Sequence, residues 1–411
     1  MEKERDIHNY QRRMDAILRS IQASDFNEAN KKALIDFDRS MQLTEQLGLP
    51  RRVKLLGTIY YLGRRYFYND LLHLTIDQLK DCIRDVEARM DSPWTAASYK
   101  ITLKKWCRWL AYGDEVTHTK KIPKIVSWMT IHIKKKDEPR VQASDILTED
   151  EIHRLIAAAE HPRDRAFISM LYELGARIGE IGSLKVGSIT RDEFSYKVDL
   201  MGKTGHRTPR IVISDPYLTN WLDQHPFNTD PEAPLWISLE GKTKRKRMMY
   251  AALRALVRRL AERAGITKRI YPHLFRHTRV THLLAKKMIN EAQAKVFFGW
   301  TPESKVLSSY SHLRSEDVND TILEMNGIKS QPQQGQQATK LCPRCRRVNT
   351  LEAKFCILCS SVLDPTVAFQ DEQEKSKLDR LLNLLLNDSD IQAIVLKKLS
   401  TQSVEALKGL L

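Results

Sequence analysis

The chain has 411 residues, 42% of them hydrophobic, and a formal net charge of +16 at pH 7. Its length allows two or three domains, and no apolar run reaches the ~18 residues of a membrane span, which excludes membrane-spanning classes and predicts no membrane partner. Residues 1–6 lack the apolar segment of a secretory signal, so we expect a cytoplasmic protein. The basic balance favours a polyanionic partner such as nucleic acid, although charge alone leaves an anionic membrane surface open.

Residues 1–115 are predicted to form a helical domain. Apolar residues recur at helical spacing over residues 7–21 and 34–47, and Thr75 with Gln78 predicts a capping box for a later helix. Lys and Arg are available on the outside of such a bundle. The pattern fits either a DNA clamp or a plain interaction module, and the sequence does not separate the two.

Residues 116–145 are charged and contain proline, which predicts a basic linker. Thr148 and Glu151 then form a predicted capping box at the start of a second domain, residues 146–328. Two domains joined by a basic strap could close around a duplex.

An amphipathic helix is predicted over residues 166–174 and ends at Gly175. Arg177 then begins a short helix, with Glu180 one turn later. The carboxylate either holds the Arg177 guanidinium in place for function or forms a surface ion pair worth a few tenths of a kcal/mol.

Alternating apolar residues over 194–200 predict a half-buried strand, residues 201–206 a turn, and residues 209–213 a returning strand. Lys203 lies near the tip of this predicted hairpin. It is either a group that serves a groove or an ordinary loop lysine.

Lys and Arg then gather over residues 242–269, where Glu262 is the single acidic residue. Phosphate contacts from such a patch would release counterions and make DNA binding weaken steeply with salt. A basic solvated face is the alternative.

A helix is predicted to begin at Pro272 or His273, because proline suits the first helical position. His273 and Arg276 are three residues apart and would share a face beside the unpaired N–H groups of the helix N-terminus. Such a pair is typical of an oxyanion clamp, although alone it also fits a solvated basic face.

Six residues of the second domain stand in a particular order, within the phrases Glu-Leu-Gly-Ala-Arg-Ile-Gly-Glu, Gly-Lys-Thr-Gly-His-Arg, Pro-His-Leu-Phe-Arg-His-Thr, Phe-Phe-Gly-Trp and Tyr-Ser-His-Leu. This series resembles the Arg, Lys, His-x-x-Arg, His-or-Trp, Tyr signature of the tyrosine recombinases, or phage integrase family. The resemblance covers residues 147–328 and, more loosely, the helical domain before them. The matching positions are Arg177, Lys203, His273, Arg276, Trp300 and Tyr310.

The resemblance implies a mainly α fold with a small β-hairpin or sheet (α+β), built from a helical core-binding domain and a catalytic domain. It implies that Tyr310 attacks a DNA phosphodiester to form a 3′-phosphotyrosyl intermediate, that Lys203 is the general acid, and that the two arginines, His273 and Trp300 stabilise the phosphorane-like charge. Neither a catalytic metal nor ATP is then required. Trp300 and Tyr310 lie slightly farther apart than is usual in the family, which concerns the loop before the nucleophile.

The same resemblance implies double-stranded DNA as the partner and a homotetramer as the synaptic complex, acting in integration, excision or recombination. A type IB topoisomerase that relaxes a single duplex is one alternative. A catalytically silent DNA-binding regulator of the same fold is another.

Four of the six cysteines form paired Cys-x-x-Cys motifs within residues 341–364, which predicts a structural Cys₄ zinc ribbon. Disulfides are the alternative, and they are disfavoured in a reducing cytosol. Cys82 and Cys107 are predicted to be small buried residues. The predicted zinc ligands are Cys342, Cys345, Cys356 and Cys359.

The remaining C-terminal segments are a Gln- and Pro-rich linker at residues 329–340 and a predicted amphipathic helical tail at residues 365–411. The ribbon between them resembles ribbons appended to archaeal recombinases, except that Arg346 and Ser360 stand where glycine often follows each motif. The apolar stripe of the tail could pack on a neighbouring protomer or on its own domain.

Overall fold

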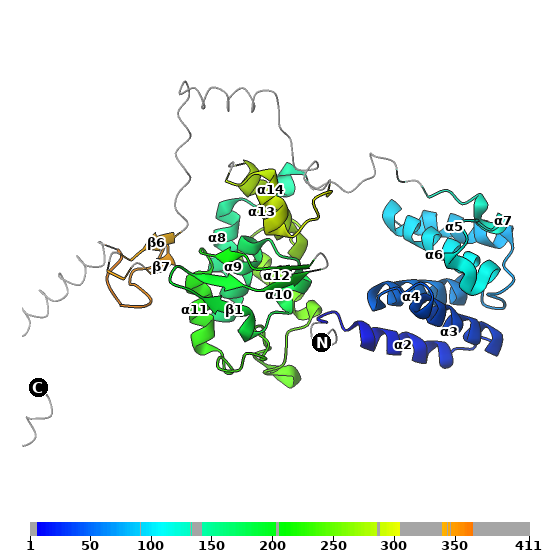
Figure 1. The fold of residues 1–411 in the computed structure, drawn as a ribbon, viewed down its shortest axis with the longest axis horizontal. Coiled ribbons are helices and arrows are strands. Elements are labelled where there is room, and N and C mark those ends of the chain that lie inside the picture. The colour runs from blue at the N-terminus through cyan, green and yellow to red at the C-terminus, as the bar shows by residue number, and fades with distance from the viewer. Residues whose placement is uncertain are drawn as a thin grey trace, which may run out of the picture.

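The computed structural model describes residues 6–90, 92–131, 133, 142–202, 205–285, 288–304, 339–342, 344, 345 and 347–364. Lys203, Tyr310 and the predicted tail at residues 365–411 lie outside this part. Within it the chain is mainly helical with three small antiparallel sheets, as predicted (Figure 1). None of the helices described here combines the length and the apolar character needed to cross a membrane.

The first group of helices packs around a core that contains Phe37 and Trp106, whose rings lie 5.0 Å apart. The capping box of Thr75 and Gln78 is confirmed, and Cys82 and Cys107 are buried, as expected. The helices are α2 (Tyr10–Gln22), α3 (Glu28–Leu43), α4 (Leu49–Tyr66), α5 (Ile76–Arg89), α6 (Pro93–Tyr112) and α7 (Lys124–Ser127).

The core of this first group extends farther along the chain than the sequence pattern indicated. Val126 and Met129 are buried in it, although residues 116–145 were predicted to be linker. Val126 lies in the short helix α7 and Met129 lies just after it, so the apolar pattern is too short for periodicity to detect.

Ile7 departs from the helical stripe predicted over residues 7–21. The helix α2 begins only at Tyr10, after Asn9 in the left-handed conformation, and the Asp6 carboxylate accepts hydrogen bonds from the N–H groups of His8 and Tyr10. The Ile7 side chain is instead buried in a second hydrophobic core, whose other members lie between Leu147 and Phe275. The backbone carbonyl of Ile7 accepts a hydrogen bond from the Tyr250 N–H at 2.9 Å. The N-terminal segment therefore belongs to the packing of a region more than 100 residues away in the chain.

The second group of helices surrounds α9, which packs against α8, α11 and α13 and buries nearly every side chain it carries (Figure 1). The capping box of Thr148 and Glu151 at the start of α8 is confirmed. The helices are α8 (Glu149–Ala157), α9 (Pro162–Leu174), α10 (Ile178–Gly182), α11 (Asp215–Gln224), α12 (Tyr250–Arg263), α13 (Pro272–Ala285) and α14 (Glu291–Phe298).

The strand predicted over residues 194–200 is wrong as a single element. It divides at Asp199, whose N–H donates to the Ser188 carbonyl, and Phe194 is exposed outside any strand. The strands are β1 (Ile189–Arg191), β2 (Tyr196–Val198), β3 (Leu200–Gly202), β4 (Gly205–Arg207) and β5 (Arg210–Ile211).

The predicted hairpin is confirmed only in part. The strands β2 and β5 pair as expected, but residues 201–206, predicted as a turn, contribute to two further strands. The strands β3 and β4 pair with Gly202 opposite Gly205, so residues 203 and 204 connect them. The other three strands form a separate sheet in the order β1-β2-β5. The strands β6 (Thr339–Leu341) and β7 (Val348–Thr350) form a third, two-stranded sheet whose strand β7 packs on α11.

Candidate active site and cysteine cluster

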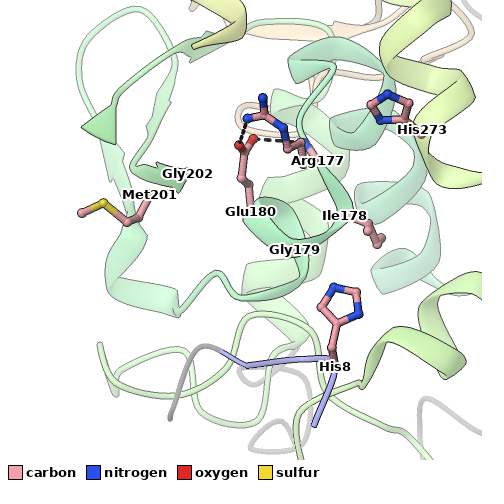
Figure 2. Close-up of a pocket in the computed structure, with 8 residues that line it drawn as sticks. All are labelled: His8, Arg177, Ile178, Gly179, Glu180, Met201, Gly202 and His273. Atoms are coloured by element: carbon pink, nitrogen blue, oxygen red, sulfur yellow. Dashed lines mark hydrogen bonds and ion pairs between the residues drawn. The ribbon is translucent and has the colours of Figure 1, made fainter. Parts of the chain in front are cut away.

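Arg177 is positioned by the turn between α9 and α10. Gly175 ends α9 in the left-handed conformation (φ 51°, ψ 30°), and Arg177 is the residue that precedes α10. Its Nη1 donates to Glu180 Oε1 at 2.7 Å and its backbone N–H to Glu180 Oε2 at 3.0 Å (Figure 2). Because Glu180 is only 4% exposed, a buried carboxylate orients the partly exposed Arg177 side chain, which distinguishes the pair from an ordinary surface ion pair.

His273 lies in the first turn of α13, which begins at Pro272 as predicted. It lines the same pocket as Arg177, a cavity of ≈ 380 Å³ that is also lined by His8, Glu180 and Met201 (Figure 2). Desolvation by the surrounding pocket, and then the positive charges of Arg276 and Arg177, lower the pKa of His273 from its ordinary value, although its side chain is exposed at the mouth of the pocket. The imidazole is therefore neutral at pH 7 and able to accept a proton.

Arg276 lies one turn beyond His273 but does not line the pocket, and it is 3% exposed. Its Nη1 donates to the Gly175 carbonyl at 3.1 Å and its Nη2 to the Phe298 carbonyl at 2.7 Å. These bonds tie the end of α9 to the end of α14. The sequence predicted that Arg276 shares a helix face with His273, either as an oxyanion clamp or as a solvated basic face. The solvated face is wrong for Arg276, which is a buried cation that holds two turns together.

Trp300 follows the left-handed Gly299 that ends α14. The Arg276 guanidinium carbon lies 5.1 Å from the centre of the Trp300 ring, a cation–π distance. The structure thus brings Arg177 and His273 to one pocket and places Arg276 against Trp300. Lys203 and Tyr310 lie outside the described residues, although Gly202, which directly precedes Lys203, lines the pocket.

Sequence reasoning missed three residues at this site. His277 lies with its ring centre 4.7 Å from that of His273, and burial, then His273 and Arg276, lower its pKa to about 4. His8 lines the pocket from the N-terminal segment and stacks on Tyr250 at 4.6 Å. Arg207 donates to the buried Glu180. His277 stands beside the motif and Arg207 within a quoted phrase, but no local pattern pointed to His8.

The four cysteines of the C-terminal ribbon form a second cluster. Their Sγ atoms all lie within 4.8 Å of one another, with Cys342 and Cys359 3.6 Å apart and Cys345 and Cys356 3.5 Å apart. None is disulfide-bonded. Tetrahedral Zn–S bonds of about 2.3 Å place sulfurs about 3.8 Å apart, so the four thiols fit a four-coordinate thiolate-binding metal such as Zn²⁺.

This cysteine ribbon is attached to the second group of helices by a buried ion pair. The Arg347 Nη2 lies 2.9 Å from Asp215 Oδ1, and the Asp215 side chain is fully buried. Arg191 contacts the same carboxylate at 3.3 Å. Two guanidinium groups thus offset the burial of one carboxylate where β7 meets α11.

Arg177 and His273 line one pocket, and the buried Arg276 lies one turn of helix from His273, so this region has the positive charge and donors that suit an anionic group. Residues 145–317 match the family model described as the phage integrase family. This part of the chain is therefore similar to the phage integrase family, and the rest of the chain lies outside the match.

Known proteins similar to this chain include tyrosine recombinases from two organisms. One from Thermosipho africanus is 28% identical over 195 residues, 46% of this chain and 64% of that protein. Tyrosine recombinase XerA of Pyrococcus furiosus is 30% identical over 142 residues, 34% of this chain and 48% of that protein. The chain thus spans less than two thirds of the length of these curated relatives.

A solved structure of a lambda integrase tetramer bound to a Holliday junction has a similar fold. The match has a TM-score of 0.51 at 15% identity and covers 67% of this chain and 78% of that chain.

Proposed function

We propose that the chain is a site-specific tyrosine recombinase, an enzyme that cleaves and rejoins DNA strands through a 3′-phosphotyrosyl intermediate. The observation that carries the proposal is the placement of Arg177 and a neutral His273 on one pocket, inside a domain that matches the phage integrase family. The family signature then proposes a role for each of its six residues.

In the proposed reaction the Tyr310 oxygen attacks the scissile phosphorus while the bond from phosphorus to the 5′ oxygen breaks. His273 takes the proton of the Tyr310 hydroxyl, which the lowered pKa of the imidazole permits at neutral pH. Lys203, as general acid, gives a proton to the leaving 5′ oxygen. The phosphodiester energy is retained in the phosphotyrosyl bond, so the reverse attack by a 5′ hydroxyl rejoins the strand.

The charge on the non-bridging oxygens is met by the cations around the pocket. Arg177 lines the pocket, and its Nη1 group donates a hydrogen bond to Glu180. Arg276 adds positive charge within a low-dielectric environment, where it acts more strongly than in water. Protein groups thus supply the stabilisation, and the proposal requires neither a catalytic metal nor ATP.

Double-stranded DNA is the proposed partner. The exposed face of α12 carries four arginines over less than four turns of helix, within the basic stretch 242–269. Such a surface binds phosphates without reading sequence, and its affinity should fall steeply with salt. By likeness to the tetrameric integrase complex, we propose four protomers on two DNA sites. The exposed residues of α12 are Arg254, Arg258, Arg259 and Arg263.

We further propose that Cys342, Cys345, Cys356 and Cys359 hold one structural Zn²⁺, which would leave no open coordination position for catalysis. Metal analysis of the purified protein should find about one zinc per chain by this coordination chemistry. Cys356→Ser should abolish binding, whereas Cys82→Ser, outside the cluster, should not. Retention of zinc in Cys356→Ser would refute the assignment. Thiolate ligation also favours a cytoplasmic location, where thiols stay reduced.

Covalent adduct formation tests the proposed reaction. A library of duplexes with a fixed nick and random sequence, labelled at the 5′ end of the cut strand, traps the intermediate because the short 5′-hydroxyl fragment is lost. The protein should give a denaturation-resistant, labelled adduct that is absent in Tyr310→Phe and present in Tyr271→Phe, a tyrosine that packs on the second core. No adduct would favour a silent DNA-binding regulator. An adduct with plasmid relaxation by dilute monomer and no recombinants would favour the topoisomerase alternative.

A further inference from the structure

Arg207, the last residue of β4, is a buried cation for which the proposed reaction as described above has no role. Its side chain is 8% exposed, and Nη2 donates to Glu180 Oε2 at 2.7 Å. Its Nε and Nη1 atoms are buried and have no hydrogen-bond partner among the described residues. Buried unpaired donors cost about 1–3 kcal/mol each, so an arginine in this place requires a compensating interaction.

Part of the compensation comes from Glu180, which two arginines share. Arg177 occupies Oε1 through its side chain and Oε2 through its backbone N–H, and Arg207 donates to Oε2. Burial acts to raise the pKa of Glu180, but the hydrogen bonds from Arg207 and Arg177 lower it overall. Two guanidinium groups on one carboxylate leave a net positive charge at the pocket, so the Arg177 charge is not cancelled by its own orienting partner.

Arg207 also lies between two glycines, Gly202 and Gly299, each of which directly precedes an expected catalytic residue. A Cβ added to Gly299, the residue before Trp300, would lie 2.8 Å from Arg207 Nη1. A Cβ on Gly202, the residue before Lys203, would lie 3.5 Å from the same atom and 2.5 Å from Glu180 Oε1. The guanidinium thus lies close to the backbone at both Gly202 and Gly299 while it donates to Glu180.

We propose that Arg207 is a positioning residue that fixes Arg177, through Glu180, and sets the spacing between Gly202, which precedes Lys203, and Gly299, which precedes Trp300. This role rests on the proposed strand-transfer function. It needs an arginine, because only a planar guanidinium can donate to Glu180 along one edge and lie flat between two backbones. Lysine would keep the charge but lose this shape.

The test compares Arg207→Ala and Arg207→Lys with the unmodified protein on the nicked random-sequence library. We expect single-turnover adduct formation to fall about 100-fold in Arg207→Ala, the cost of a misplacement of about 1 Å at a reacting centre. The Kd for duplex DNA should change less than about threefold, because the exposed basic surface supplies most of the affinity. Arg207→Lys should recover only part of the rate.

Chemical rescue separates positioning from a general loss of structure. Guanidinium chloride at non-denaturing concentration should restore adduct formation in Arg207→Ala by refilling the vacated space, whereas equal sodium chloride should not. Arg210→Ala is the matched control, because this neighbouring arginine pairs with Asp192 and does not line the pocket. Its adduct rate should equal that of the unmodified protein, with and without guanidinium.

Three results would count against the inference or its basis. An adduct rate in Arg207→Ala within about threefold of the unmodified protein would overturn the positioning role. So would a loss that guanidinium does not restore while the melting temperature is unchanged. Absence of any adduct in the unmodified protein would instead overturn the proposed function, and the role of Arg207 with it.

Discussion

Gly175→Ala should destabilise the protein through both its backbone and its packing, because Gly175 lies against Phe298, which packs with Val280, Leu283 and Ala294 in a small separate core. The φ of +51° at Gly175 costs an L-residue about 1–2 kcal/mol. An added Cβ would also lie 2.6 Å from the ring of Phe298, which is fully buried. Relieving such a clash in a packed core costs about 1–3 kcal/mol. We therefore expect Gly175→Ala to lower the free energy of unfolding by about 2–5 kcal/mol.

Gly265→Ala is the control that isolates the backbone cost. Gly265 has a similar φ of +64°, but a Cβ there would meet no atom within 4 Å, so only about 1–2 kcal/mol should be lost. Urea denaturation followed by circular dichroism measures both variants. Because the Gly175 carbonyl accepts from Arg276, adduct formation should also fall in Gly175→Ala alone. Equal destabilisation by the two substitutions would refute the close-approach argument.

Three further predictions concern the N-terminal segment, the pocket and the ribbon. Ile7→Asp should place a charge in an apolar core, so limited trypsin digestion should cleave the N-terminal segment faster; an unchanged rate would contradict its docking. Because His273 has a lowered pKa, its contribution to stability should be complete above pH 6.5 and lost as the pH falls below it; an NMR titration midpoint at or above 6.5 would contradict this. Arg347→Ala should cost about 1–3 kcal/mol, since Asp215 keeps Arg191, and should speed hydrogen exchange in β7 without loss of zinc; unchanged exchange would count against the anchor.

The sequence predicted local structure well where one physical rule acts alone. The capping boxes at Thr75 and Thr148, the stop at Gly175 and the start at Pro272 all follow from backbone groups that need partners close in the chain. It failed where distant packing decides. Ile7 fits a helical stripe by spacing, yet burial against the second core is worth more than one additional helical turn.

The candidate site was predictable to a similar degree. The pairing of Arg177 with Glu180 follows from their three-residue spacing, and the structure adds that the carboxylate is buried. The burial of Arg276 could not be predicted from the sequence, because the His-x-x-Arg spacing determines which helix face the residues share but not how deeply that face is buried. The contribution of Arg207 depends on β4 lying against α10 and α14, which is a tertiary fact.

The glycines at the site explain why such short phrases carry so much information. Gly175 stands two residues before Arg177, Gly202 one before Lys203, and Gly299 one before Trp300. A Cβ at these three positions would collide, in the same order, with Phe298, Glu180 and Arg207, at 2.6, 2.5 and 2.8 Å. Three of the six expected catalytic residues are therefore preceded by a backbone position that must let another side chain approach closely. These glycines allow Glu180, Arg207 and Phe298 to pack closely against the backbone beside the expected catalytic residues. Close packing of this kind, more than any one charge, is what holds Arg177 and its neighbours in position.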